Sequence, residues 1–104
     1  MINAAIEKWG RIDIVICNAA SHWTGNIKDM KIEYWDATID SKLSGSFYLM
    51  HYALPHMIEH KYGRFVNVSS NAFIGLQGMA AYSAATCGIW AFTKAAAQDL
   101  VDYG

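Results

Sequence analysis

Charged side chains are scarce in this sequence of 104 residues. Asp, Glu, Lys and Arg make up 16% of it, against about 25% in an average soluble domain, and 54% of the residues are hydrophobic. Eight Lys and Arg are balanced by nine Asp and Glu, so the chain has no excess of positive charge to attract phosphates. Neither nucleic acid nor an anionic membrane is therefore an expected partner. A chain this short has room for one domain only. The excess of apolar residues indicates that a partner covers part of the chain's surface, or that the chain belongs to a larger protein.

Long hydrophobic runs and targeting segments are also missing. No apolar run reaches the ~18 residues of a membrane span, and residues 1–7 lack the positive start and apolar stretch of a secretory signal. These absences favour a cytoplasmic protein. The two cysteines, Cys17 and Cys87, lie far apart in apolar surroundings, so we expect buried thiols rather than a disulfide or a CxxC site.

Two short runs of apolar, mostly β-branched or aromatic residues predict strands at Ile12–Cys17 and Phe65–Ser69. Polar residues hardly alternate with the apolar ones, which is typical of parallel strands covered on both faces. Helical periodicity precedes, separates and follows the two runs. The order helix, strand, helix, strand, helix indicates an α/β fold with a parallel sheet and right-handed crossovers. Because two strands are too few for such a sheet, we expect further elements outside these residues.

Three helices are predicted, over residues 1–9, about 31–60 and about 80–103. Gly10 ends the first. In the long middle helix, Gly45 and Pro55 interrupt the pattern. Because Pro55 has no backbone N–H to donate, we expect a kink or a break near His51.

In open α/β sheets, ligands bind at the carboxyl ends of the strands, which here carry Asn18-Ala19-Ala20 and Ser69-Ser70. Tyr82 opens the last helix twelve residues after Ser70, close enough for the loop to fold its phenol over the hydroxyl. A phenol, with a pKa near 10, exchanges protons poorly at neutral pH unless a positive charge stabilises its anion. A lysine one helical turn on would supply that charge, but the position holds Thr86.

Four motifs in register resemble the short-chain dehydrogenase/reductase family. They are IDIVICNAA at residues 12–20, WD at 35–36 with LSGSF at 43–47, GRFVNVSS at 63–70 and YSAA at 82–85. The match extends along essentially the whole chain, in the family's order and spacing. The resemblance implies a Rossmann-type, doubly wound parallel sheet, here with two strands and flanking long helices. It also implies hydride transfer between NAD or NADP and a small-molecule carbonyl or secondary alcohol.

The resemblance carries roles onto matching positions. Ser70 matches the serine that binds the substrate oxygen, with Ser69 as its neighbour, and Tyr82 matches the acid/base. Asn18-Ala19-Ala20 looks like the family's Asn-Ala-Gly segment, which lines the adenosine side of the cofactor. Ala20 stands where the family has glycine. The methyl group of Ala20 makes a close approach to the backbone harder.

Two catalytic positions depart from the family. Thr86 stands in place of the lysine that follows the tyrosine, and Lys42 in place of the asparagine that precedes Leu-x-Gly. Threonine supplies no charge, and Lys94 lies ~18 Å along the helix from Tyr82. The family's geometry turns the position of Lys42 toward the vacated lysine site. We therefore hypothesise that Lys42 restores the missing charge from the other helix.

Other family features do not occur in these residues. No Gly-rich dinucleotide turn is present, nor a residue that would select NAD or NADP. The sequence thus matches a central segment of one Rossmann domain, over residues 1–104, and we expect it to be inactive by itself. The family also implies a homo-oligomer that pairs the two long helices. The alternative is a catalytically impaired relative with a structural or oligomerisation role only.

A rival motif is His56-Met57-Ile58-Glu59-His60, which spells the H-x-x-E-H of one class of zinc peptidase. It follows a proline, lacks an evident third ligand and sits at a polar helix end, where histidines interact favourably with the helix dipole. We therefore expect no metal site.

Overall fold

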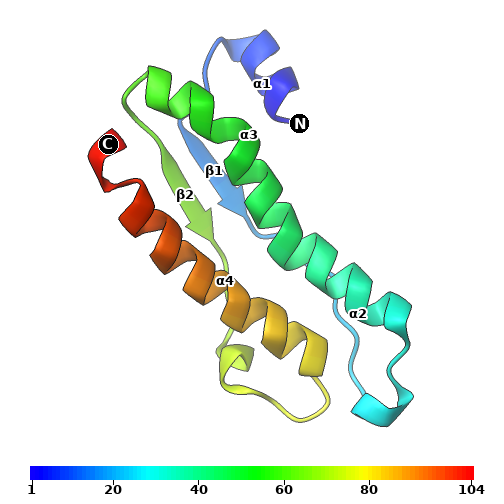
Figure 1. Ribbon diagram of the computed structural model, residues 1–104. Coiled ribbons are helices and arrows are strands. Elements are labelled where there is room, and N and C mark those ends of the chain that lie inside the picture. The colour runs from blue at the N-terminus through cyan, green and yellow to red at the C-terminus, as the bar shows by residue number, and fades with distance from the viewer.

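The computed structural model describes all 104 residues as a two-stranded parallel sheet with four α-helices (Figure 1). The elements are α1 (Ile2–Trp9), β1 (Ile14–Cys17), α2 (Ile32–Ile39), α3 (Gly45–Glu59), β2 (Arg64–Asn67) and α4 (Ala80–Asp99). The strands are neighbours, with Ile14 opposite Arg64 and Cys17 opposite Asn67. The predicted α/β class and parallel pairing are confirmed, although each strand is shorter than expected.

The helices lie along the strands in a flat molecule of 48 × 27 × 17 Å. In Figure 1, α3 and α4 run side by side, with α3 packed on β1, α4 on β2, and α1 beside the end of α3. The main apolar cluster joins α1, β1 and α3, and its buried residues are Ile2, Val15, Cys17, Ala53 and Met57. Alternate residues of β1 thus face the helices.

The opposite face of the sheet is bare. Ile14 and Ile16 are 57% and 64% exposed, and Val66, the register partner of Ile16, is 48% exposed. The residues of this chain thus cover one face of the strands, and the expected cover on the other face would have to come from the further elements expected outside them. The exposed positions of β1 account for the apolar run in the sequence. Every second residue of this strand has a large aliphatic side chain on which nothing in this chain packs.

The long middle helix is interrupted at a different place from the one predicted. A π-helical turn at Asp40–Ser44, referred to below as the π-turn, separates α2 from α3, and α3 continues through Pro55. The expected break near His51 is wrong because His51 and Pro55 are both exposed, so water can satisfy the carbonyl that proline leaves without a donor. Gly45 follows the π-turn, where a Cβ would lie 3.2 Å from the Asp40 carbonyl oxygen.

The end of α1 and the two cysteines agree only in part with the sequence pattern. Gly10 ends α1 in the left-handed region, with φ of 77°, as predicted. Both cysteines are free, but only Cys17 is buried. The expectation of a second buried thiol is wrong, because Cys87 lies on the exposed side of α4. Burial raises the pKa of the Cys17 thiol, an effect that a hydrogen bond with Ser46 partly offsets.

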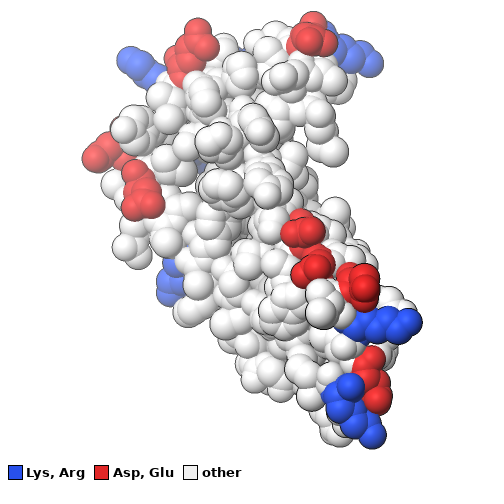
Figure 2. Space-filling view, turned by 45° about the vertical axis from the view of Figure 1, so that its right-hand side comes forward, with Lys and Arg blue, Asp and Glu red and all other residues white.

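The charged side chains lie mainly around the rim of the face shown in Figure 2 and leave a broad uncharged middle. This distribution matches the low charged fraction of the sequence. None of the helices has the length and apolar character needed to cross a membrane.

The contact between Gly63 and Met57 gives a test of the packing below α3. A Cβ at Gly63 would lie 2.5 Å from Sδ and 2.8 Å from Cβ of Met57, which is itself buried. We expect Gly63→Ala to lower the free energy of unfolding by about 1–3 kcal/mol, because the added methyl overpacks this contact. Thermal and urea unfolding followed by circular dichroism measure the effect. In a double-mutant cycle with Met57→Ala, Gly63→Ala should lower the free energy of unfolding by less than it does in the wild-type background. An unchanged loss would mean that the destabilisation does not come from the contact with Met57.

Candidate active site

Two loops meet at the carboxyl ends of the strands, at the lower end of Figure 1. Residues 18–31 follow β1 and residues 68–79 follow β2, and the Gly25 amide donates to the Gly78 carbonyl over 2.9 Å. The Ser21 amide donates to the Ser41 hydroxyl over 2.8 Å, which ties the first loop to the π-turn. Between the loops lies an open hollow of about 470 Å³ that reaches Ala80 at the start of α4.

Tyr82 lies at this end of the molecule, in the first turn of α4, and is partly buried. Lys42 Nζ lies 5.4 Å from the centroid of the Tyr82 ring, over its face. The His22 ring lies 5.5 Å from the same ring, tilted by 54°. An ammonium, a phenol and an imidazole from three separate segments thus meet at the predicted end of the sheet.

Lys42 is held in the π-turn with only 3% of its surface exposed. Its Nζ donates to the Val68 carbonyl oxygen over 2.8 Å, just beyond the end of β2. No carboxylate neutralises it, since the only ion pair in the structure joins Arg11 and Asp13. Burial therefore lowers the pKa of the Lys42 ammonium.

Thr86, one turn after Tyr82, is fully buried and supplies no charge. Its hydroxyl donates to the carbonyl oxygens of Tyr82 and Ser83, at 2.9 and 3.1 Å. The Ser83 hydroxyl accepts from the Leu76 amide over 3.2 Å, which anchors the second loop to α4. Both hydroxyls thus serve local hydrogen bonding, Thr86 within its helix and Ser83 to the loop before it.

The two serines after β2 have different partners. The Ser69 hydroxyl donates to the Thr86 carbonyl over 3.1 Å, so it fixes the end of β2 against α4. The Ser70 hydroxyl accepts from the Ala72 amide over 3.2 Å and lies 3.3 Å from Asn71 Oδ1, as the cap of a short 3₁₀ turn. No hydrogen bond joins Ser70 to Tyr82. The structure thus brings Lys42 to Tyr82 and leaves the Ser70 hydroxyl engaged with its own loop.

The asparagines at the strand ends also differ. Asn18, Ala19 and Ala20 are exposed at the carboxyl end of β1, where open α/β sheets receive a dinucleotide, and their small side chains leave the backbone accessible. These residues fit part of such a site. Asn67 instead faces inward: its Nδ2 donates to Thr93 Oγ1 over 2.9 Å, and its Oδ1 is buried without a partner. The Asn67 amide therefore ties β2 to α4.

Sequence reasoning missed two features of this site. The π-turn leaves no mark in the apolar periodicity, because apolar residues still recur at four-residue steps across it, at Ile39, Leu43 and Phe47. His22 was missed because it lies in an irregular loop, although a signal existed: the loop follows the carboxyl end of a predicted strand, where ligands bind.

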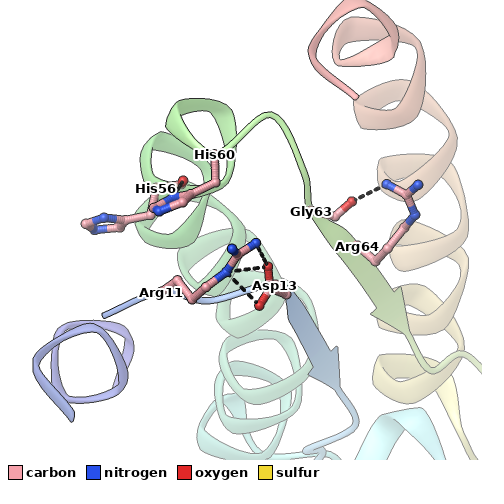
Figure 3. A network of polar contacts seen from close by, with 6 residues as sticks. All are labelled: Arg11, Asp13, His56, His60, Gly63 and Arg64. Carbon is pink, nitrogen blue, oxygen red and sulfur yellow. Dashed lines mark hydrogen bonds and ion pairs between the residues drawn. The ribbon is translucent and has the colours of Figure 1, made fainter. Parts of the chain in front are cut away.

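The H-x-x-E-H segment lies at the opposite end of the molecule, near the start of β2 (Figure 3). His60 Nδ1 lies 2.8 Å from the His56 carbonyl oxygen, so the end of the helix engages it. No group of three or more His, Cys, Asp or Glu side chains is arranged to hold a metal ion. The same view shows the Arg11–Asp13 pair, which is exposed and raises the pKa of the Arg11 guanidinium through its hydrogen bond and charge.

Comparison with known proteins agrees with this fold. The family model described as short chain dehydrogenase matches residues 1–104, and the chain belongs to this family. It is 37% identical over 100 residues to the (2S)-[(R)-hydroxy(phenyl)methyl]succinyl-CoA dehydrogenase subunit BbsD of Thauera aromatica, with 96% of this chain and 40% of the relative covered. It is 40% identical over 99 residues to the acetoacetyl-CoA reductase of an Acinetobacter species, with 94% and 40% covered.

A solved structure is similar over nearly all of the chain. A metagenomic short-chain oxidoreductase in complex with NADP superimposes with a TM-score of 0.92 at 30% identity, covering 98% of this chain and 47% of that one. The partial Rossmann-type fold is therefore confirmed. The chain spans about 40% of the length of the curated relatives that it matches first.

The buried Lys42 ammonium predicts a pH-dependent stability. As pH rises from the lowered pKa toward the ordinary value of 10.5, the unfolded chain keeps a proton that the folded chain has lost, so the stability contribution of Lys42 rises with pH. Below that window both states are charged, and the folded state carries the full cost of burying the charge. We expect Lys42→Met to raise the free energy of unfolding by about 1 kcal/mol at pH 7 and to flatten this rise.

Chemical denaturation between pH 7 and 10.5 measures the effect. Lys94→Met serves as the control, because this lysine is exposed and its Nζ lies over the Trp90 ring at 4.6 Å. The control should leave the pH dependence unchanged. A loss of stability in Lys42→Met at both ends of the range would mean that the hydrogen bond to Val68 outweighs the cost of burying the charge.

Proposed function

We propose that residues 1–104 form the central segment of a single Rossmann domain in an NAD(P)-dependent oxidoreductase that interconverts a carbonyl and a secondary alcohol. Membership of the short-chain dehydrogenase family supports the reaction class. The bare face of β1 and β2 supports the segment assignment, since the aliphatic side chains of Ile14 and Ile16 need cover. The 104 residues alone lack a Gly-rich phosphate turn, so we expect them to be inactive without the rest of such a domain.

The cofactor would lie against Asn18, Ala19 and Ala20 at the carboxyl end of β1. Their exposure and small size suit a backbone approach, and the similar metagenomic oxidoreductase binds NADP. When bound, the dinucleotide supplies or accepts the hydride. Nothing in these residues selects between NAD and NADP.

Tyr82 is the proposed acid/base. In the reducing direction its hydroxyl gives a proton to the oxygen of the substrate, while Ser70 holds that oxygen by a hydrogen bond after its hydroxyl turns away from Asn71. The tyrosinate that remains needs a positive charge nearby. The Lys42 ammonium, 5.4 Å from the Tyr82 ring and buried where water screens little, meets this need. This contact is the observation that carries the proposal.

In this proposal the positive charge beside Tyr82 comes from a lysine of the π-turn and not from a lysine of α4. Thr86 fills the position that would hold a lysine on α4, and its buried hydroxyl supplies no charge because it donates to carbonyls of its own helix. Lys42 reaches the tyrosine from the neighbouring segment, and the Val68 carbonyl fixes its Nζ. Lys42 and Thr86 would therefore act as a compensating pair of substitutions.

An acyl thioester is the class of carbonyl substrate that we propose. The names of the Thauera and Acinetobacter relatives both specify coenzyme A thioesters, and the 3-oxoacyl-[acyl-carrier-protein] reductase of Synechocystis, 36% identical over 105 residues, acts on another thioester. The hollow of about 470 Å³ between the loops, beside the start of α4, offers space for the acyl part. Acetoacetyl-CoA is therefore the first substrate to test.

Exchange of Lys42 and Thr86 tests the proposed site in the full-length gene product. We expect Lys42→Asn to lower kcat about 100-fold or more with acetoacetyl-CoA and NADH or NADPH, because the tyrosinate loses its charge partner. Thr86→Lys alone should lower stability, because it crowds a second ammonium against the first. The double variant Lys42→Asn/Thr86→Lys should recover most of the activity.

Tyr82→Phe is the reference for complete loss of acid/base function. If Lys42→Asn leaves kcat and the alkaline limb of the pH–rate profile unchanged, Lys42 has no role in catalysis. If the wild-type protein turns over no carbonyl substrate with either cofactor, the enzymatic assignment itself is wrong.

A structural or oligomerisation role without catalysis is the second candidate, and exposed aromatic rings on the long helices favour it. Phe47, Tyr48 and Tyr52 on α3 and Trp90 on α4 are each about half exposed, on helices that the family pairs across subunits. The same surface would serve a homo-oligomeric enzyme.

We expect the full-length protein to form dimers or larger homo-oligomers. Replacement of one of these rings by a charge, as in Tyr52→Glu, should weaken the assembly at least tenfold, because it buries an unpaired carboxylate. Analytical ultracentrifugation over a concentration series measures this, with Lys8→Glu on the exposed side of α1 as the control. A monomer at all concentrations would contradict the assembly.

A further inference from the structure

His22 lies beside Tyr82, in the loop that follows β1. It is exposed, and its ring packs on the Tyr82 ring with centroids 5.5 Å apart. Two hydrogen bonds hold its loop on either side, from the Ser21 amide to the Ser41 hydroxyl and from the Gly25 amide to the Gly78 carbonyl. The position of the imidazole over the phenol is therefore set by the fold.

A tyrosine that gives up a proton in each turnover must recover one from water. The other groups around Tyr82 are poorly placed to deliver it. Lys42 is 97% buried and its Nζ is bonded to the Val68 carbonyl, and the buried Thr86 hydroxyl donates to carbonyls of its own helix. Of the Lys42, Thr86 and His22 side chains, only that of His22 is exposed to solvent, and its ring nitrogens can carry a proton.

We propose that His22 relays protons between Tyr82 and bulk water, an inference that rests on the proposed function. After the Tyr82 hydroxyl has protonated the substrate oxygen, the His22 imidazolium gives a proton to the tyrosinate oxygen, directly or through one water. The neutral imidazole then takes a proton from solvent. The net reaction consumes one proton from water for each hydride transferred, and the oxidising direction runs through the same steps in reverse.

The charges around His22 suit this role. Tyr82 faces it from α4, Lys42 lies on the other side of the phenol in the π-turn, and Ser41, which holds its loop, is neutral. No carboxylate is paired with any of them, since the only ion pair lies at the other end of the sheet. The His22 imidazole is therefore not held in an ion pair.

Substitution of His22 in the full-length protein tests the relay. We expect His22→Ala to lower kcat for reduction of acetoacetyl-CoA at least tenfold with little change in KM. Added imidazole should restore at least half of the activity, because it fits the space left by the side chain. His22→Phe keeps the ring on Tyr82 but cannot carry a proton, so it should stay slow and resist rescue.

His60→Ala is the matched control, because it removes an exposed histidine at the opposite end of the sheet. It should keep wild-type activity and pH dependence. A His22→Phe variant as fast as wild type would overturn the relay and leave only a packing role, as would a loss of activity in His22→Ala that imidazole does not restore. If Tyr82→Phe abolishes activity while His22 variants remain active, the relay fails and the proposed function stands; a wild-type protein without activity overturns both.

Discussion

A buried ammonium without a carboxylate partner is the constraint around which this site is organised. Lys42 has one strong contact, the hydrogen bond of 2.8 Å to the Val68 carbonyl, and it lies over the face of Tyr82 at 5.4 Å. Burial without an opposite charge is costly, and such groups are concentrated where function needs a perturbed charge. The strand end, the π-turn and the start of α4 must all stay in register to satisfy this one group.

The π-turn explains how a residue of the middle helix reaches the site. A regular α-helix through Asp40–Ser44 would hold its side chains at 100° steps, whereas the wider turn changes the direction of those that follow it. Gly45 permits the turn to close against the Asp40 carbonyl. Pro55, the more conspicuous irregularity in the sequence, has less effect, because its missing hydrogen bond falls on an exposed side of α3.

The sequence predicted the order of the elements and the end of the sheet that carries the site, since both follow from apolar periodicity and parallel pairing. It also predicted Tyr82 and Lys42 as neighbours, but only through the family resemblance. Periodicity could not reveal the π-turn, the bare face of the sheet or the contact of His22 with Tyr82. The first is a local change in winding, the second depends on what covers the strands, and the third on loop hydrogen bonds between residues far apart in sequence.

The position of the ammonium on the π-turn, and not on α4, affects what fixes its distance from Tyr82. A lysine one turn after Tyr82 would share its helix and follow any movement of α4, whereas Lys42 is fixed to the end of β2 through Val68. The distance between charge and phenol then depends on how α4 sits against the sheet, which Ser69 and Asn67 control through their bonds to Thr86 and Thr93. The polar side chains at the end of β2 thus help to fix Tyr82 and the Lys42 ammonium relative to one another.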